Sequence, residues 1–268
     1  MKALSILTEI RARRPLLHCI SNAVSSNDCA NLALAIGASP MMAPAFEEAE
    51  AMTVLAQATV LNLGTPDAAR FRTCKACLSA VEKHPQPVIM DPVGVGASRW
   101  RLYQTAELLA AFHPTVLRLN FGEALALCGM PGQEQGVDSV SAASEHDRVN
   151  LAVRLAQLQH TTVLLTGKED YVTDGRRVFR ISGGSERICR VTGAGDMLSV
   201  LCAAFTAVEQ DAAMAAAQAA VFWKCCAEYA ETVAADHGIG SFHFALLDAA
   251  ESIRPEQLQK DGRMIQLH

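Results

Sequence analysis

The sequence lacks several features that would place it in common functional classes. It contains no dense block of Lys or Arg, and its formal net charge is −5, whereas a general nucleic-acid-binding protein is expected to present a basic face. The most apolar later run, 212–223, is bounded by Asp211 and Lys224 and is too short to span a bilayer. Glu9 and Arg11 interrupt the only N-terminal stretch that could resemble a signal peptide. We therefore expect a soluble, cytoplasmic protein that binds neither nucleic acid nor membranes.

The common nucleotide and metal motifs are also missing. No G-x-x-x-x-G-K-[ST] pattern occurs, which excludes a P-loop, and a dinucleotide fingerprint fails because Leu198 stands where its third glycine belongs. The eight histidines show no metal-binding spacing. The nine cysteines are an odd number in a chain of this length, and Cys74 and Cys77 fall within a helical pattern, so we predict structural cysteines rather than disulfides or a zinc site.

Short apolar runs alternate with longer amphipathic stretches along most of the chain, which is typical of an α/β protein with a mainly parallel central sheet and helices on both faces. The predicted strands are 16–20, 39–43, 59–63, 87–91, 115–119 and 161–166, followed by a hairpin of 170–173 and 177–181. The predicted helices are 27–36, 66–83, 102–112, 194–208, 212–235 and 241–253. The polar stretch 129–147 is expected to be a surface loop within a single domain that spans residues 1–268.

The run Val191-Thr192-Gly193-Ala194-Gly195-Asp196 leads directly into an apolar helical pattern and is the most informative segment. Two glycines let a ligand approach the backbone, and the amides of Gly193, Ala194 and Gly195 at a helix N-terminus form a hole for an anion such as phosphate. A carboxylate beside that anion is placed to deprotonate an attacking hydroxyl. The same residues also fit a plain glycine turn in which Asp196 only starts the helix.

Other distinctive segments occur in order along nearly the whole chain. They are 18–24 (HCISNAV), 37–42 (GASPMM), 61–65 (LNLGT), 91–97 (DPVGVGA), 118–123 (RLNFGE), 166–172 (TGKEDYV), 191–196 (VTGAGD) and 238–242 (GIGSF). Together they resemble the hydroxyethylthiazole kinases, thiamine-salvage enzymes of the ribokinase-like superfamily. Two positions depart from that family: Asp196 stands where many members carry Cys, although Asp is usual in the superfamily, and Leu119 stands where the family often has Gly.

The resemblance implies a ribokinase-like fold and a defined reaction. ATP would phosphorylate the hydroxyl of 4-methyl-5-(2-hydroxyethyl)thiazole in a reaction that depends on Mg²⁺. The protein would be a homotrimer with active sites at the subunit interfaces. Asp196 would be the catalytic base, and the amides of the preceding glycine turn would stabilise the transferring phosphoryl group.

The resemblance also assigns binding roles, each of which has an ordinary structural alternative. Arg118 and Thr166 match ATP-contacting positions, but could form a surface ion pair and a turn hydroxyl. Asn120 and Glu123 match an N-x-x-E element suited to Mg²⁺, directly or through water, but also fit a helix cap.

Two further positions complete the expected site. Asp91 ends an apolar strand at the edge where α/β sheets bind ligands, which suits a metal role, but Asp-Pro also opens turns. Met42 and Gly193 match substrate-contacting positions, although the spacing of Met41 and Met42 equally fits the core.

Three other functions remain open at this point. One is a kinase of another heteroaromatic alcohol, of the hydroxymethylpyrimidine or pyridoxal type. Another is an ATP-dependent NAD(P)H-hydrate dehydratase, which shares the glycine–Asp turn. The third is a nucleotide-binding regulator without activity, which the presence of Asp196, Asn120 and Glu123 disfavours.

Overall fold

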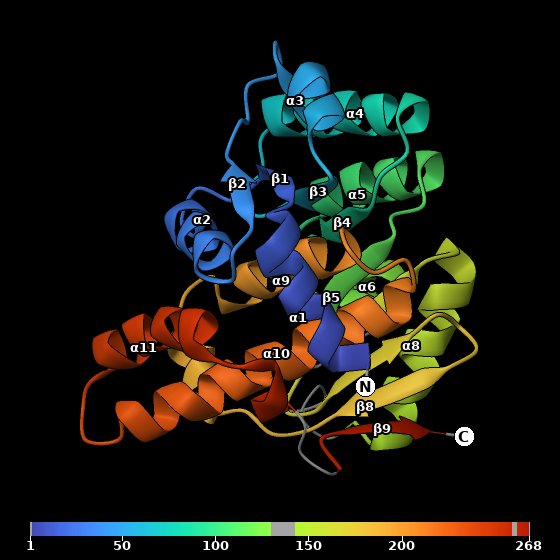
Figure 1. Cartoon of the computed structure of the whole chain (residues 1–268). Helices are drawn as coiled ribbons and strands as arrows, with labels where there is room; N and C mark the ends of the chain where they lie inside the picture. The colour runs from blue at the N-terminus through green and yellow to red at the C-terminus, as the bar shows by residue number, and fades with distance from the viewer. Residues whose placement is uncertain (1, 130–142, 259–261, 268) are drawn as a thin grey trace.

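The computed structural model describes residues 2–129, 143–258 and 262–267. Strands and helices alternate through most of the chain (Figure 1). The strands are β1 Leu16–Ile20, β2 Ser39–Met41, β3 Ala58–Asn62, β4 Val88–Asp91, β5 Val116–Asn120, β6 Thr162–Thr166, β7 Asp170–Thr173, β8 Val178–Ile181 and β9 Met264–Leu267. The helices are α1 Lys2–Arg13, α2 Ser26–Ala35, α3 Ala49–Leu55, α4 Ala68–Lys83, α5 Arg99–Ala111, α6 Phe121–Leu127, α8 Glu145–Gln159, α9 Ala194–Thr206, α10 Ala212–Val233 and α11 Ile239–Ser252.

The strands form one nine-stranded sheet in the order β2-β1-β3-β4-β5-β6-β7-β8-β9. The pairs from β2 to β6 are parallel, and the last three pairs are antiparallel. The predicted strands and hairpin are confirmed to within two residues at each end. Because β1 to β6 all run parallel, their carboxyl ends lie at the same edge of the sheet.

A separate apolar core lies on each face of the sheet. One core joins the sheet to α1, α2, α9, α10 and α11, and the other joins it to α3, α4, α5, α6 and α8. Successive residues of β6 alternate between them: Leu164 faces the first core, whereas Val163 and Leu165 face the second. Leu119 is fully buried in the second core, so a large side chain is accommodated where the family often has Gly.

The helix boundaries follow from local sequence signals. Asp67 accepts the amide of Arg70 and thereby caps α4, and Gly37, with φ of +94°, adopts the left-handed conformation that follows α2. The helices α9 and α10 are apolar on nearly all sides because they are buried between the sheet and their neighbours, and α10 lies along α11 (Figure 1). In the part of the chain that the structure describes, no helix is both long enough and apolar enough to cross a bilayer.

Several elements were not predicted from the sequence. These are the helices α1, α3, α6 and α8 and the last strand, β9, which pairs with β8. Residues 130–142 of the predicted loop 129–147 lie outside the described residues, and α8 already begins at Glu145, where Ser144 caps it. The prediction of structural cysteines agrees with the buried positions of Cys74 and Cys77 on α4.

Candidate active site

Four neighbouring strands each end in a polar residue at the same edge of the sheet. Asn62 ends β3, Asp91 ends β4, Asn120 ends β5 and Thr166 ends β6. The strand register pairs Asn62 with Asp91 and Asn120 with Thr166. Open α/β sheets bind their ligands beyond the carboxyl ends of the strands, so this row of side chains forms one wall of a candidate site.

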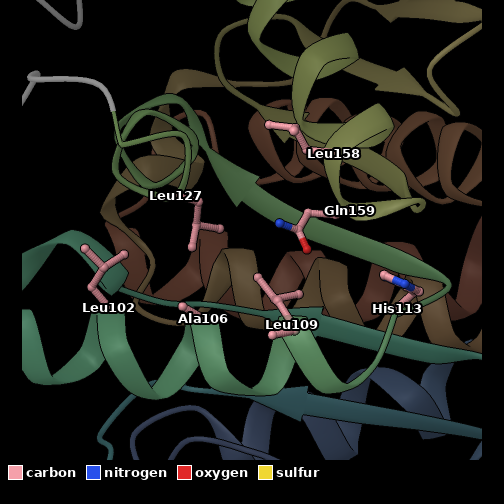
Figure 2. Close-up of a pocket in the computed structure, with 8 residues that line it drawn as sticks. Leu102, Ala106, Leu109, His113, Leu127, Leu158 and Gln159 are labelled. Carbon is pink, nitrogen blue, oxygen red and sulfur yellow. The ribbon is translucent and has the colours of Figure 1, made fainter.

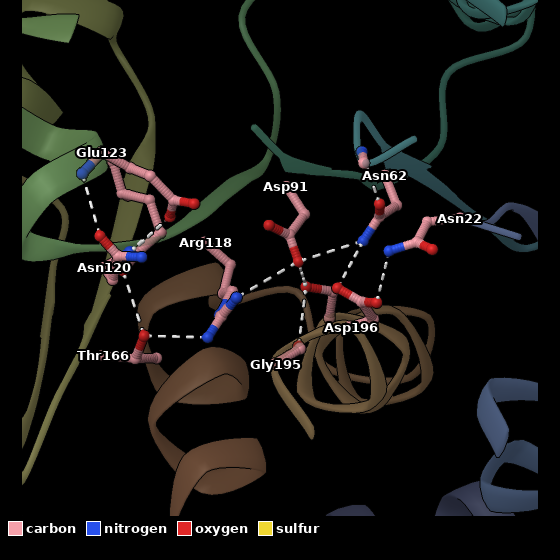
Figure 3. Close-up of polar contacts among 12 residues, drawn as sticks. Asn22, Asn62, Asp91, Arg118, Asn120, Glu123, Thr166, Gly195 and Asp196 are labelled. Atoms are coloured by element: carbon pink, nitrogen blue, oxygen red, sulfur yellow. Dashed lines mark hydrogen bonds and ion pairs between the residues drawn. The ribbon is translucent and has the colours of Figure 1, made fainter. Parts of the chain in front are cut away.

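Asp196 faces this row from the first turn of α9 and is only 7% exposed (Figure 3). Its Oδ1 accepts a hydrogen bond from Nδ2 of Asn62 at 2.9 Å, and its Oδ2 accepts one from Nδ2 of Asn22 at 2.9 Å. The hydroxyl of Ser25 donates to the same Oδ2. The carboxylate is thus held by side chains that follow β1 and end β3, and it does more than start its own helix.

Sequence reasoning did not assign roles to these donors. The rule that placed Asp91 could also have identified Asn62, because Asn62 is a polar residue at the end of a fully buried strand. Asn22 lies within a segment that resembles the family, and its place after β1 follows the same rule. Ser199, one turn into α9, was also missed; its hydroxyl donates to Oδ2 of Asp91 at 2.6 Å.

Asp91 is completely buried, and one of its oxygens is unsatisfied. Oδ2 contacts Nη1 of Arg118 at 3.4 Å, whereas Oδ1 has no hydrogen-bond partner. Burial raises the pKa of Asp91 to about 7, and the nearby guanidinium opposes that rise. A buried acceptor without a partner is costly in a folded protein, so Oδ1 has unused capacity for a cation or a donor.

Arg118 crosses the site from β5 to the start of α9. Its Nη2 donates to the hydroxyl of Thr166 at 3.0 Å, and its side chain is only 13% exposed, so it is not the surface ion pair considered above. A Cβ atom added to Gly195 would lie 2.4 Å from Nη1 of Arg118. Glycine at this position therefore lets the guanidinium lie against the first turn of the helix.

This juxtaposition concentrates positive potential. The N-terminus of a helix carries a partial positive charge and normally disfavours a cation. Here the cation lies against it, with Asp91 and Asp196 nearby. The combination of a guanidinium and the amides at the start of a helix is suited to oxygens of a phosphate group. Gly193 precedes the helix in the left-handed conformation, with φ of +80°, and the amide of Ala194 makes a long bond of 3.3 Å to the carbonyl of Val191.

Asn120 and Glu123 form the helix cap that was considered as their alternative role. Oδ1 of Asn120 accepts the amide of Glu123 at 2.9 Å, and Oε2 of Glu123 accepts the amide of Asn120 at 2.8 Å. Oε1 of Glu123 also accepts the amide of Gly94, at 2.8 Å, and so fixes the loop after β4. Each carboxylate oxygen retains a second lone pair, so the cap does not prevent a contact with a water molecule.

Met42 directly follows β2, the edge strand beside β1, and packs as a partly buried side chain against the first core. It lies at the same carboxyl edge as the other candidate residues, but the contacts found for it are those of a core residue. An apolar hollow of about 260 Å³ lies elsewhere, between α5, α6 and α8 (Figure 2). None of the predicted site residues lines it.

The sequence matches known proteins over almost its whole length. The model of the hydroxyethylthiazole kinase family matches residues 7–256. A hydroxyethylthiazole kinase from Roseiflexus sp. (strain RS-1) is 40% identical over 97% of this chain and 95% of its own length. The chain belongs to the hydroxyethylthiazole kinase family. The solved structure of a hydroxyethylthiazole kinase protein from Pyrococcus horikoshii OT3 is 38% identical in sequence. Its alignment covers 100% of this chain and 100% of that chain, with a TM-score of 0.89.

More distant structures share only the fold. An ADP/ATP-dependent NAD(P)H-hydrate dehydratase from Bacillus subtilis is 16% identical, with a TM-score of 0.59 over 90% of this chain. The ribokinase-like α/β fold expected from the sequence is therefore confirmed, and family membership favours thiazole kinase activity over the dehydratase and the other kinases considered above.

Proposed function

We propose that this enzyme transfers the γ-phosphoryl group of ATP to the hydroxyl of 4-methyl-5-(2-hydroxyethyl)thiazole, giving ADP and the thiazole phosphate, a step of thiamine salvage. Family membership supports the activity. The observation that carries the chemistry is the buried Asp196 carboxylate at the start of α9, beside the guanidinium of Arg118.

The site contains the groups that such a transfer requires. Asp196 would accept the proton of the substrate hydroxyl as its oxygen attacks the γ-phosphorus. Phosphoryl transfer depends mainly on positioning and on charge stabilisation, so a carboxylate of ordinary basicity is sufficient. The amides of Gly193, Ala194 and Gly195, together with Arg118, would stabilise negative charge on the phosphoryl oxygens. Thr166 would hold the guanidinium and contact ATP.

The residues of the site also fit a magnesium ion. Mg²⁺ prefers a few carboxylate oxygens and several waters, and Oδ1 of Asp91 is a buried carboxylate oxygen without a partner. Asp91 would hold the ion with Asn120 and Glu123, the last through water because both of its oxygens already accept backbone amides. When bound, the ion would neutralise charge on the phosphate oxygens of ATP.

The contacts of the substrate ring and the assembly of subunits both concern residues at the carboxyl edge of the sheet. Met42, after β2, would contact the thiazole ring together with Gly193. Val24 and Phe46, on the loops after β1 and β2, are 62% and 51% exposed, which supports a site completed by a neighbouring subunit in a homotrimer. Light scattering across a range of protein concentrations would measure that assembly. The cytoplasm is the compartment that we infer.

Product analysis tests the proposal. We would measure ADP release with thiazole, pyrimidine, pyridoxal and sugar alcohols, and identify the product by ³¹P NMR. The expected result is a phosphate ester of the thiazole alcohol, formed with kcat/KM among the highest of the panel. If the thiazole alcohol is not a preferred substrate, or if hydrated NADH is converted to NADH instead, the proposal is wrong. Asp196→Asn is the matched control for contaminating kinases.

A further inference from the structure

Ser25 occupies the N-cap position of α2, yet its side chain does not cap that helix. Its carbonyl accepts the amide of Cys29 at 2.9 Å, as an N-cap carbonyl should, but its hydroxyl makes no cap bond and instead donates to Asp196 on α9. The side chain is almost completely buried, at 1% exposed. A Ser in this position normally accepts an amide of its own first turn, which stabilises the helix.

The other Ser and Asp residues at the N-caps of α-helices in the described chain follow the usual rule. The side chains at the starts of α4, α5, α8 and α10 each accept the amide three positions later; these residues are Asp67, Ser98, Ser144 and Asp211. Ser25 therefore gives up a local stabilisation that its counterparts keep. A departure from local preference of this kind is expected where a residue serves a functional site.

The backbone of the glycine turn is shaped to admit Ser25. A Cβ atom added to Gly193 would lie 2.4 Å from Cβ of Ser25, and Gly193 has φ of +80°, which disfavours any residue with a side chain. The start of α2 thus packs directly against the start of α9. This contact holds the Ser25 hydroxyl at the Asp196 carboxylate.

Counting lone pairs on Asp196 shows which oxygen is free. A carboxylate oxygen has two lone pairs, and Oδ2 accepts from both Ser25 and Asn22. Oδ1 accepts one bond, from Asn62. One acceptor position, on Oδ1, thus remains after the protein donors are counted.

We propose that Ser25 is a positioning residue that, with Asn22, fills Oδ2 of Asp196, so that Oδ1 receives the proton of the substrate hydroxyl. This inference rests on the proposed function. In the step, the alcohol O–H bond breaks and its proton moves to Oδ1, while the alcohol oxygen bonds to the γ-phosphorus. The bond between the γ-phosphorus and the bridging oxygen breaks, and its electron pair leaves with ADP.

A double-mutant cycle tests whether Ser25 acts through Asp196. In the wild-type background, Ser25→Ala should lower kcat about 10- to 100-fold, as expected for loss of a hydrogen bond to a charged group, and should change either KM less than about threefold. In the Asp196→Asn background, the same substitution should change kcat less than about threefold, because its effect depends on the carboxylate. Ser25→Cys retains a weaker donor of similar size and should have an intermediate kcat, which also covers a failure of the alanine variant to fold.

Ser144→Ala is the control for an ordinary N-cap. It should lower the melting temperature and leave kcat unchanged, whereas Ser25→Ala should lower kcat and have only a small effect on the melting temperature. Equal losses of kcat from Ser25→Ala in both backgrounds, or losses confined to KM, would overturn the positioning role while leaving Asp196 as the base. If Asp196→Asn itself has normal kcat, the proposed function of that carboxylate fails instead.

Discussion

Replacing Arg118 with Ala should weaken ATP binding far more than binding of the thiazole alcohol. The guanidinium lies against the first turn of α9 and is held by Asp91 at 3.4 Å and by Thr166 at 3.0 Å. A hydrogen bond to a charged group contributes about 1.5–3 kcal/mol. Since about 1.4 kcal/mol corresponds to a tenfold change in affinity, the dissociation constant of ATP should rise roughly 10- to 150-fold.

Arg118→Ala should lower the stability of the folded protein less than the removal of one partner of a buried ion pair usually does. Burial already raises the pKa of Asp91 to about 7, and loss of the guanidinium raises it further. At neutral pH the carboxyl group of the variant therefore takes up a proton instead of remaining as an unpaired buried charge. We expect a folded protein whose melting temperature falls only modestly.

Calorimetric titration with a non-hydrolysable ATP analogue and, separately, with the thiazole alcohol would measure both affinities. Arg118→Lys is the matched control, because it keeps the charge but loses the planar group that reaches Asp91 and Thr166 together, and it should fall between the wild type and the alanine variant. A folded Arg118→Ala protein that binds the analogue within about threefold of wild type would refute the assignment.

Two further predictions concern Met42, which follows β2, and His18, in the middle of β1. Met42→Asp should raise the KM for the thiazole alcohol in a folded protein, because a carboxylate in an apolar pocket is desolvated; steady-state kinetics with unchanged KM would place Met42 in the core alone. His18 is buried between the Thr53 hydroxyl (3.0 Å) and the Ala43 carbonyl (2.9 Å), and burial lowers its pKa below 6.5. As the pH falls, the imidazole of His18 is therefore protonated in the unfolded chain before it is protonated in the folded protein. The free energy of unfolding of the wild type should thus fall relative to that of His18→Gln as the pH drops through about 6.5. Urea midpoints whose difference stays constant between pH 8 and 5.5 would contradict this.

The sequence was sufficient to predict most of the sheet and part of the site. Buried strands read as short apolar runs, and a polar residue that follows such a run must lie at the carboxyl edge, which is why Asp91 could be placed from the sequence. The helix α1 was predictable too, because Ile6, Leu7 and Ile10 have helical spacing and are buried. The short strand β9 gave no such signal, since two of its four residues are exposed.

The partners of Asp196 could not be predicted from sequence spacing. Asn22 and Ser25 lie 174 and 171 residues away from it, and the packing of β1 and α2 against α9 brings them together. Ser25 is especially misleading, because an N-cap Ser is usually explained by its own helix. For Asn120 and Glu123 the local helix-cap interpretation was the one realised, and it coexists with the metal role that we propose.

The most direct test of the central claim is the turnover of Asp196→Asn and Asp196→Cys compared with wild type. Asn keeps the shape of the carboxylate, but its amide nitrogen can accept neither the proton nor a bond from a protein donor, so kcat should fall about 10²–10⁴-fold while the affinity for ATP stays nearly constant. Cys should be milder, because a thiol at a helix N-terminus is acidified and can serve as a base. The predicted order of kcat is Asp, then Cys, then Asn, and an Asn variant within about threefold of wild type would contradict the assignment of Asp196 as the base.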